Sequence, residues 1–147
     1  LILCYVGGSH FSGEQQHDLQ KSIVENEEER IKDLNYLKKI AVEIKDCLLI
    51  NDLEKIGELL HTSWEKKRQL SDKITNPKVD LFYSVGIKNG AYGGKLLGAG
   101  GGGYILFFCI PQKRKRLKRA LEEWGGEVMN FNFEFSGTKV WPVRSKF

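Results

Sequence analysis

The chain has 147 residues, a length that fits one folded domain with a substantial hydrophobic core. Apolar residues make up 41% of it and charged residues 29%, which is typical of a soluble globular protein, and no apolar run approaches the roughly 20 residues of a membrane helix. The net charge of +4 is too modest to indicate nucleic-acid binding by itself. We therefore expect one cytoplasmic domain over residues 1–147, with neither a membrane nor a nucleic-acid partner.

The cysteines argue against disulfides and against a metal site. Cys4, Cys47 and Cys109 are odd in number, lie in apolar surroundings and lack metal-ligand spacing. We expect reduced core thiols and no metal bound by this chain. The chain also opens on a strand-like run without an initiator methionine, so we expect it to be an excised piece of a longer protein.

The first part of the chain is predicted to contain one strand followed by helices. "LILCYV", Leu1–Val6, is an apolar run of strand length that stops at a glycine pair. Ser12 and Gln15 have the spacing of a capping box, which predicts a helix start. One or two helices are expected between Ser12 and Leu48, because apolar residues recur there at helical spacing beside a charged face. This apolar stripe consists of Ile31, Leu34, Leu37, Ala41, Ile44 and Leu48.

Two more helices are predicted before the glycine-rich segment. Asn51 and Glu54 repeat the capping spacing and predict a helix that runs to about Leu70. The Asn-Pro pair at 76–77 predicts the next start, since proline fits the first helical position, and the Asn-Gly pair at 89–90 predicts its left-handed stop. The apolar face of the first of these helices consists of Leu53, Ile56, Leu60 and Trp64.

The remaining part is predicted to contain strands around one helix. "YILFFCI" after Gly103 is aromatic and β-branched, which predicts a central strand. Pro111 opens a helix through Trp124, and the glycine pair at 125–126 closes it. With one strand before the helices, this order favours an α+β fold, with helices stacked on one face of a mostly antiparallel sheet.

Alternating aromatic residues follow the last helix. Met129, Phe131, Phe133 and Phe135 recur at period two, which predicts a strand half buried against helices. A Ser-Gly turn at 136–137 then allows "TKVWPV" to pair back as a final strand. We interpret Trp64, Trp124 and the Phe131 series as core or interdomain packing.

The segment "KLLGAGGGGYILFF", Lys95–Phe108, carries the strongest functional signal. Gly98, Gly100 and Gly103 match a dinucleotide fingerprint, but that site needs a helix after the glycines, and here a strand follows. A Walker loop is excluded because Asn89 and Leu96 stand where it needs glycine and serine or threonine. A protein-kinase loop is excluded because no V-A-I-K, H-R-D or D-F-G segment is present. Two interpretations remain: a close-packed hairpin connection, or a backbone surface whose N–H groups converge on an anion.

"GAYGGKLLGAGGGGYILFF" closely resembles the third motif of the GHMP kinases, which include galactokinase, mevalonate kinase and homoserine kinase. "LHTSWEKKRQLSDKITNPKVDLFYSVGIKNGAYGG" and "FNFEFSGTKVW" resemble most the branch that phosphorylates D-glycero-D-manno-heptose 7-phosphate. The resemblance implies that this chain is the ferredoxin-like C-terminal domain of a two-domain kinase that uses ATP and Mg²⁺. It also implies a missing N-terminal domain that carries the main phosphate loop and the catalytic aspartate, so no catalytic residue is expected here and the chain alone should be inactive. A kinase of galactose, fucose or a mevalonate-like alcohol, and a non-enzymatic ferredoxin-like binding module, remain as alternatives.

The resemblance also assigns site residues. It places Gly98, Ala99, Gly100, Gly101 and Gly102 beside the ATP phosphates. Lys95 is expected either to face phosphate or to solvate a strand edge. Ser9 and His10 are candidates for binding the phosphorylated sugar, because free N–H groups at the start of a helix favour anions; relatives commonly carry arginine at the position of His10. The basic run Lys113–Arg119 is interpreted as a solvated helix surface.

Overall fold

The computed structural model describes residues 1–8 and 27–141 of the chain. The helix that we predict to start at Ser12 lies outside these residues. The described elements, in chain order, are β1 (Ile2–Gly7), α2 (Glu27–Leu49), α3 (Leu53–Arg68), α4 (Pro77–Lys88), β2 (Gly93–Leu96), β3 (Gly103–Phe108), α5 (Pro111–Glu123) and β4 (Glu127–Met129). None of the described helices is long and apolar enough to cross a membrane.

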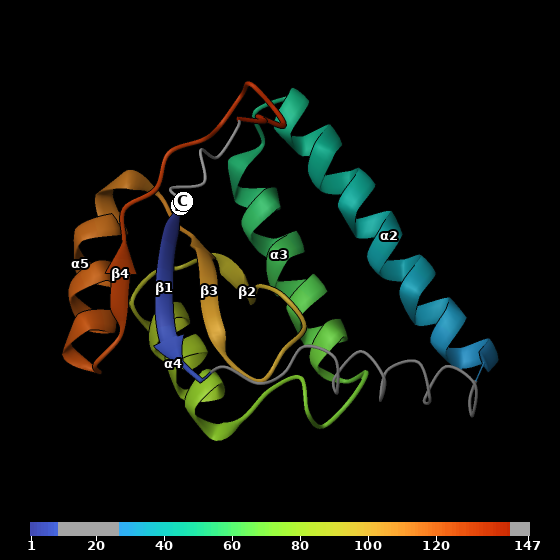
Figure 1. Cartoon of the computed structure of the whole chain (residues 1–147), viewed down its shortest axis with the longest axis horizontal. Coiled ribbons are helices and arrows are strands. Elements are labelled where there is room, and N and C mark those ends of the chain that lie inside the picture. The colour runs from blue at the N-terminus through green and yellow to red at the C-terminus, as the bar shows by residue number, and fades with distance from the viewer. Residues whose placement is uncertain (9–26, 142–147) are drawn as a thin grey trace, which may run out of the picture.

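The strands form one antiparallel sheet in the order β2-β3-β1-β4. The two central strands are β3 and β1, so the central position predicted for the "YILFFCI" run is confirmed, and "LILCYV" forms a strand as predicted. Helices α4 and α5 cover one face of the sheet, and α3 lies against β2 with α2 packed outside it (Figure 1). The predicted α+β class with an antiparallel sheet is confirmed.

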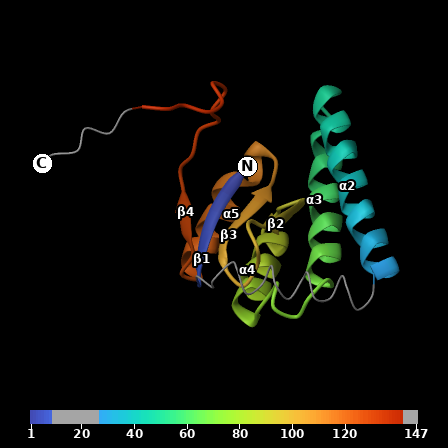
Figure 2. The ribbon, with the colours of Figure 1, turned by 45° about the vertical axis from the view of Figure 1, so that its right-hand side comes forward.

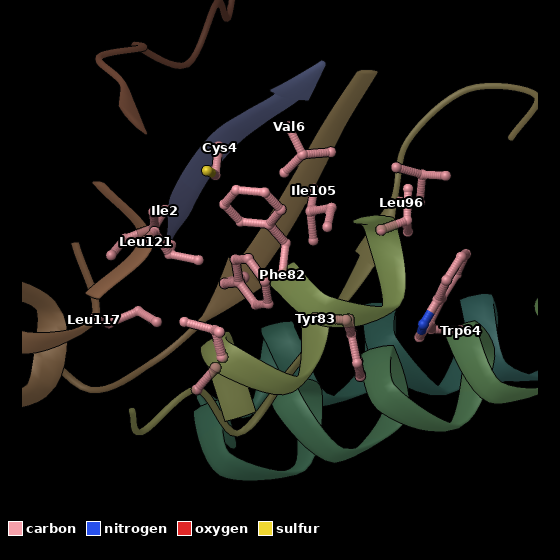
Figure 3. Packing of buried hydrophobic residues seen from close by; sticks show 14 of the residues in the cluster. Ile2, Cys4, Val6, Trp64, Phe82, Tyr83, Leu96, Ile105, Leu117 and Leu121 are labelled. Atoms are coloured by element: carbon pink, nitrogen blue, oxygen red, sulfur yellow. The ribbon is translucent and has the colours of Figure 1, made fainter. Parts of the chain in front are cut away.

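The core lies between the sheet and helices α4 and α5. Alternate residues of β1 face it, and Ile2, Cys4 and Val6 are almost completely buried. They meet Phe82 of α4 and Leu121 of α5 in the cluster drawn in Figure 3. Burial of this apolar surface is the main stabilising contribution to the fold. Burial, followed by the charge of Glu122, raises the pKa of the Cys4 thiol to about 11.

The cysteines agree with the predicted reduced state. Cys4, Cys47 and Cys109 are all free. Cys4 and Cys109 are buried, whereas Cys47 on α2 is half-buried and does not belong to the core.

The predicted apolar stripe of α2 is correct for Leu37 and Ile44 and wrong for its other residues. Ile40 is buried, and Leu37 and Ile44 are half-buried, so these residues form the inner face beside α3. Ile31, Leu34, Ala41 and Leu48 from the predicted stripe are instead exposed. The helix carries more apolar residues than one packing face needs, so periodicity alone could not select the inner one.

The helix starts were predicted with one error. Asn76 caps α4 as predicted, because its Oδ1 accepts a hydrogen bond from the Val79 N–H at 2.9 Å. The cap of α3 is Asp52, whose Oδ1 accepts from the Lys55 N–H at 3.1 Å, and not Asn51. Asn51 has a φ of 59° and makes the turn between α2 and α3. Asparagine tolerates this left-handed conformation better than most residues, which explains its place there.

The predicted last strands are not formed in the described residues. β4 ends at Met129, and Phe131, Phe133 and Phe135 are exposed instead of half buried against helices. Residues 138–141, the described part of the predicted return strand, have no strand partner, and Trp124 is 57% exposed. Figure 2 shows the segment after β4 running past the N-terminal end of β1 and away from the sheet.

Candidate functional site

The glycine-rich segment is the connection of the β2–β3 hairpin. The two strands pair from Gly93 opposite Phe108 to Leu96 opposite Ile105, and the Leu97 N–H donates to the Tyr104 carbonyl at 2.8 Å. Residues 97–102, which we call the glycine loop, therefore connect the paired strands. Positive φ angles occur at Gly98 (76°), Gly100 (127°), Gly101 (73°), Gly102 (147°) and Gly103 (97°). Such a backbone path favours glycine strongly over any residue with a side chain.

One side of the glycine loop packs against backbone. A Cβ atom on Gly100 would lie 2.8 Å from the Ile74 Cα atom, and a Cβ atom on Gly102 would lie 2.6 Å from the Gly7 carbonyl oxygen. The loop thus lies against both the α3–α4 connection and the end of β1. The close-packing interpretation of the glycines is correct for this side.

Hydrogen bonds fix the same side in place. The Gly101 N–H donates to the Ile74 carbonyl at 2.9 Å, and the Asn76 side-chain amide donates to the Gly101 carbonyl at 2.8 Å. Because Asn76 also caps α4, one side chain joins the start of this helix to the glycine loop. The Lys67 ammonium donates to the Gly98 carbonyl at 2.6 Å and holds the loop near its tip.

Another side of the loop, at Gly98, is open with respect to the described residues. A Cβ atom on Gly98 would meet no heavy atom of another residue within 4 Å. Within residues 1–8 and 27–141, the backbone N–H groups of Gly98, Ala99 and Gly100 have no acceptor. Free N–H groups on a bare backbone surface suit an anion, because the ligand can approach without meeting side chains.

Two lysines supply positive charge beside this open side. Lys95 on β2 is half-buried, and burial lowers the pKa of its ammonium. Burial, followed by the nearby charge of Lys95, lowers the pKa of Lys67. In the described part of the chain neither ammonium forms an ion pair, whereas the neighbouring Lys66 pairs with Asp33 at 2.7 Å. The two cations are thus partly desolvated, close together and unneutralised by any described carboxylate, an arrangement that an anion would stabilise.

A third cation lies at the end of β1. A Cβ atom on Gly7 would lie 2.9 Å from the Lys78 Nζ atom, which places this ammonium over the Gly7 backbone. Lys78 belongs to the first turn of α4, the helix whose cap holds the glycine loop. The start of this helix, the end of β1 and the glycine loop therefore meet at one edge of the domain.

The structure brings together most of the site residues predicted from the sequence. Gly98, Ala99, Gly100, Gly101 and Gly102 lie in one loop, with Lys95 on the strand before it. Ser9 and His10 lie outside the described residues. The described chain reaches Gly8, where a Cβ atom would lie 3.2 Å from the Gly101 carbonyl oxygen.

Sequence reasoning missed Lys67, the loop contact of Asn76, and Lys78. Lys67 lies within a run of basic residues on α3, so nothing in its spacing marks it as a loop contact. Asn76 was identified as the cap of α4, but its hydrogen bond to the glycine loop was not predicted. These contacts require the tertiary arrangement of the loop and helices.

The basic run on α5 has the exposure that was predicted for a solvated surface. Its residues are exposed except for the buried Leu117 and the half-buried Lys118. Some cations are neutralised on the same helix, because Arg119 contacts Glu123 at 2.8 Å and Lys118 contacts Glu122 at 3.6 Å. Exposed pairs of this kind contribute little to stability.

Comparisons with known proteins show the family of this chain. A family model described as GHMP kinases C terminal matches residues 40–128. D-glycero-alpha-D-manno-heptose 7-phosphate kinase from Campylobacter jejuni is 33% identical over 80% of this chain and 34% of its own length. A galactokinase from Pyrococcus furiosus is 31% identical over 55% of this chain and 23% of its own length. This chain thus spans about a third or less of the length of these two relatives.

The fold similarity extends further than the sequence similarity. The crystal structure of L. major mevalonate kinase in complex with R-mevalonate superimposes with a TM-score of 0.77, over 83% of this chain and 37% of that one. Sequence identity in this comparison is 18%, so it shows a shared fold. The family model matches more than half of the chain, and its match includes the glycine loop, α4 and both lysines beside the loop. The chain therefore belongs to the GHMP kinases and corresponds to the C-terminal domain of that family.

Proposed function

We propose that this chain is the C-terminal half of an ATP-dependent kinase, in which it supports the phosphate-binding loop of the N-terminal half. The proposed reaction transfers the γ-phosphoryl group of ATP to the anomeric hydroxyl of D-glycero-D-manno-heptose 7-phosphate. The observation that carries the proposal is the open side of the glycine loop, where free N–H groups of Gly98, Ala99 and Gly100 adjoin Lys67 and Lys95.

The residues present fit a nucleotide phosphate chain. A Cβ atom at Gly98 would meet no described residue within 4 Å, so the described part of the loop leaves room for a bulky anion. Lys67 and Lys95 would balance its charge, and both are partly desolvated, which strengthens their interaction with an anion relative to that in bulk water. MgATP supplies the phosphoryl group, and we assign the metal contacts to the proposed N-terminal half.

The chemical task of this chain is positioning. Phosphoryl transfer depends mainly on the orientation of the reacting groups and on charge stabilisation, with little covalent chemistry for the protein. The glycine loop is well suited to orient phosphates because Asn76, Ile74 and Lys67 fix its backbone. One half of the active-site cleft cannot position both reacting groups, so we expect the isolated 147-residue chain to have no kinase activity.

The heptose substrate is the finer part of the proposal. It is supported by the 33% identity to the Campylobacter jejuni heptose 7-phosphate kinase over 80% of this chain. The similarity to galactokinase and mevalonate kinase makes sugars without a phosphate and mevalonate-like alcohols the natural competitors.

The test is a comparison of initial rates of the longer kinase with ATP and a panel of acceptors. The panel contains D-glycero-D-manno-heptose 7-phosphate, galactose, fucose and mevalonate, with the 147-residue chain as the matched control. We expect the highest kcat/KM with the heptose phosphate and no turnover with the short chain. A higher kcat/KM with another acceptor would contradict the proposed heptose substrate. Absence of ATP turnover with every acceptor would contradict the proposed kinase activity.

A further inference from the structure

The pairing of β4 with β1 stops at Leu3 and Met129, two residues from the first residue of the chain. Leu3 lies opposite Met129, Cys4 opposite Val128 and Tyr5 opposite Glu127 in this antiparallel ladder. Continued in the same register, the ladder places residue 131 opposite Leu1. Residues 133 and 135 then lie opposite the second and fourth positions before Leu1, in polypeptide that precedes the described chain.

The apolar residues after β4 share one side of the chain. Phe131 and Phe133 have ring centroids 5.8 Å apart, and Phe133 and Phe135 have centroids 6.3 Å apart. Their period of two continues that of Met129, which is paired with Leu3 on the side of the sheet opposite the buried Cys4. The segment thus keeps strand-like alternation although it has no strand partner in the described chain.

Exposure along this row rises with distance from β1. Met129 and Phe131 are each 39% exposed, Phe133 is 67% exposed and Phe135 is 92% exposed. The surface is least covered where the extended register requires polypeptide that precedes Leu1. Exposed aromatic side chains in a row are a feature of interaction surfaces.

We propose that residues 130–135 continue β4 in the longer kinase. Residues 130 and 131 then pair antiparallel with Ile2 and Leu1, and residues 132–135 pair with the stretch immediately before Leu1. The existing ladder fixes the register, so extending it requires no new loop closure. Pairing with a second copy would instead cost the translational and rotational freedom of that copy. In the stretch before Leu1, the side chains that face the aromatic row must lie on the same side of the sheet as those of Leu1, Leu3 and Tyr5. We therefore expect apolar or β-branched residues at the second and fourth positions before Leu1, and no proline within this short stretch.

This inference goes beyond the proposed function, and it requires only that the protein extend before Leu1, as the longer relatives do. Its test is amide hydrogen exchange in the 147-residue chain and in the longer protein. Alternate amides in residues 130–135 should exchange at least about tenfold more slowly in the longer protein. Equal exchange in the two proteins would overturn the pairing. Protection in the short chain that increases with concentration would also overturn it in favour of a second copy.

A cysteine cross-link tests the register itself. A cysteine two positions before Leu1 should form a disulfide with Phe133→Cys in the longer protein, because directly opposed residues bring their Cβ atoms close. The matched control pairs the same upstream cysteine with Asn132→Cys, whose side chain points to the other face. Equal or greater cross-linking in the control would overturn the register.

Substitution of the aromatic row gives an independent readout. Phe133→Ser should lower the Tm of the longer protein by several degrees and leave that of the 147-residue chain unchanged, while the control Val140→Ser changes neither. An unchanged Tm in the longer protein would overturn the pairing. If the Phe133→Ser protein does not fold, the cysteine cross-link remains as the test of the pairing. Protection without kinase activity would refute the proposed function alone, and activity without protection would refute the pairing alone.

Discussion

The glycine loop and the aromatic segment after β4 are both irregular chain, but different contacts hold them. Gly101 of the loop bonds Ile74 and Asn76, and Gly98 bonds Lys67, so distant parts of the chain fix its path. The aromatic segment has mainly local contacts, such as the 2.9 Å bond of Lys139 to Glu134. The two regions differ in whether contacts with distant parts of the described chain hold them.

This difference separates two kinds of information in a sequence. The glycine pattern specifies a backbone shape, and the residues that require this shape lie within the domain. The alternating pattern of Phe131, Phe133 and Phe135 specifies one apolar side without specifying what covers it. A sequence pattern therefore predicts the need for a partner more securely than the partner's location.

The largest effect is expected inside the loop. Gly102→Ala should lower the free energy of unfolding by about 2–5 kcal/mol, because a Cβ atom would overlap the Gly7 carbonyl and the φ of 147° disfavours a side chain. Gly98→Ala is the matched control, since its Cβ atom meets nothing within 4 Å and only the backbone cost of about 1–2 kcal/mol applies. Urea denaturation of the 147-residue chain measures both, and equal losses would show that the loop is not closely packed.

The next effect concerns activity. Ala99→Leu should lower the kcat/KM of the longer kinase at least about tenfold, because a large side chain in the glycine loop would crowd the phosphates that we propose to bind there. Its Tm should change little. Ala99→Ser is the control and should retain most of the activity. A fully active Ala99→Leu enzyme would leave the loop with a structural function alone.

A smaller effect is expected where the loop meets α4. Asn76→Ala removes both the helix cap and the bond to the Gly101 carbonyl, with an expected loss of about 1–3 kcal/mol in unfolding free energy. Asn76→Asp keeps an acceptor for the Val79 N–H but has no donor for Gly101. Its loop amides should exchange faster while those of α4 stay protected, and unchanged loop exchange would contradict the proposed anchoring.

The smallest effect is expected in the aromatic segment. Phe135→Ser should change the unfolding free energy of the 147-residue chain by less than about 0.5 kcal/mol, because the side chain is almost fully exposed. Phe82→Ala is the comparison, with an expected loss of about 3–5 kcal/mol from the core. A cost above about 1 kcal/mol for Phe135→Ser, measured by the same denaturation, would show that the segment already packs within this chain.

Local signals in the sequence predicted much of the fold. Strand runs, the Asn76–Pro77 start and the glycine stops act over a few residues, so their outcome depends little on the rest of the chain. The inner face of α2 was predicted only in part, because Ile40 was left out and the exposed Ile31 and Leu48 were included. Which stripe is buried depends on the position of α3, and this is tertiary information.

The glycine loop and Lys95 of the candidate site were identified from the sequence, whereas Lys67 and Lys78 were not. The glycines are adjacent in sequence, so their pattern is visible before folding. Lys67 lies 31 residues from Gly98, and only the packing of α3 beside the hairpin brings its ammonium to the loop. Nothing in the sequence distinguishes a lysine that contacts a distant loop from the other lysines of a charged helix.

The shared use of Asn76 has a consequence for ligand binding. Because this side chain both caps α4 and holds the Gly101 carbonyl, the glycine loop cannot move away from its place without exposing the first turn of a helix to fraying. A segment rich in glycine would otherwise lose much conformational entropy when a ligand orders it. Here folding has already met most of that cost, so the loop is preorganised for its ligand although its composition suggests flexibility.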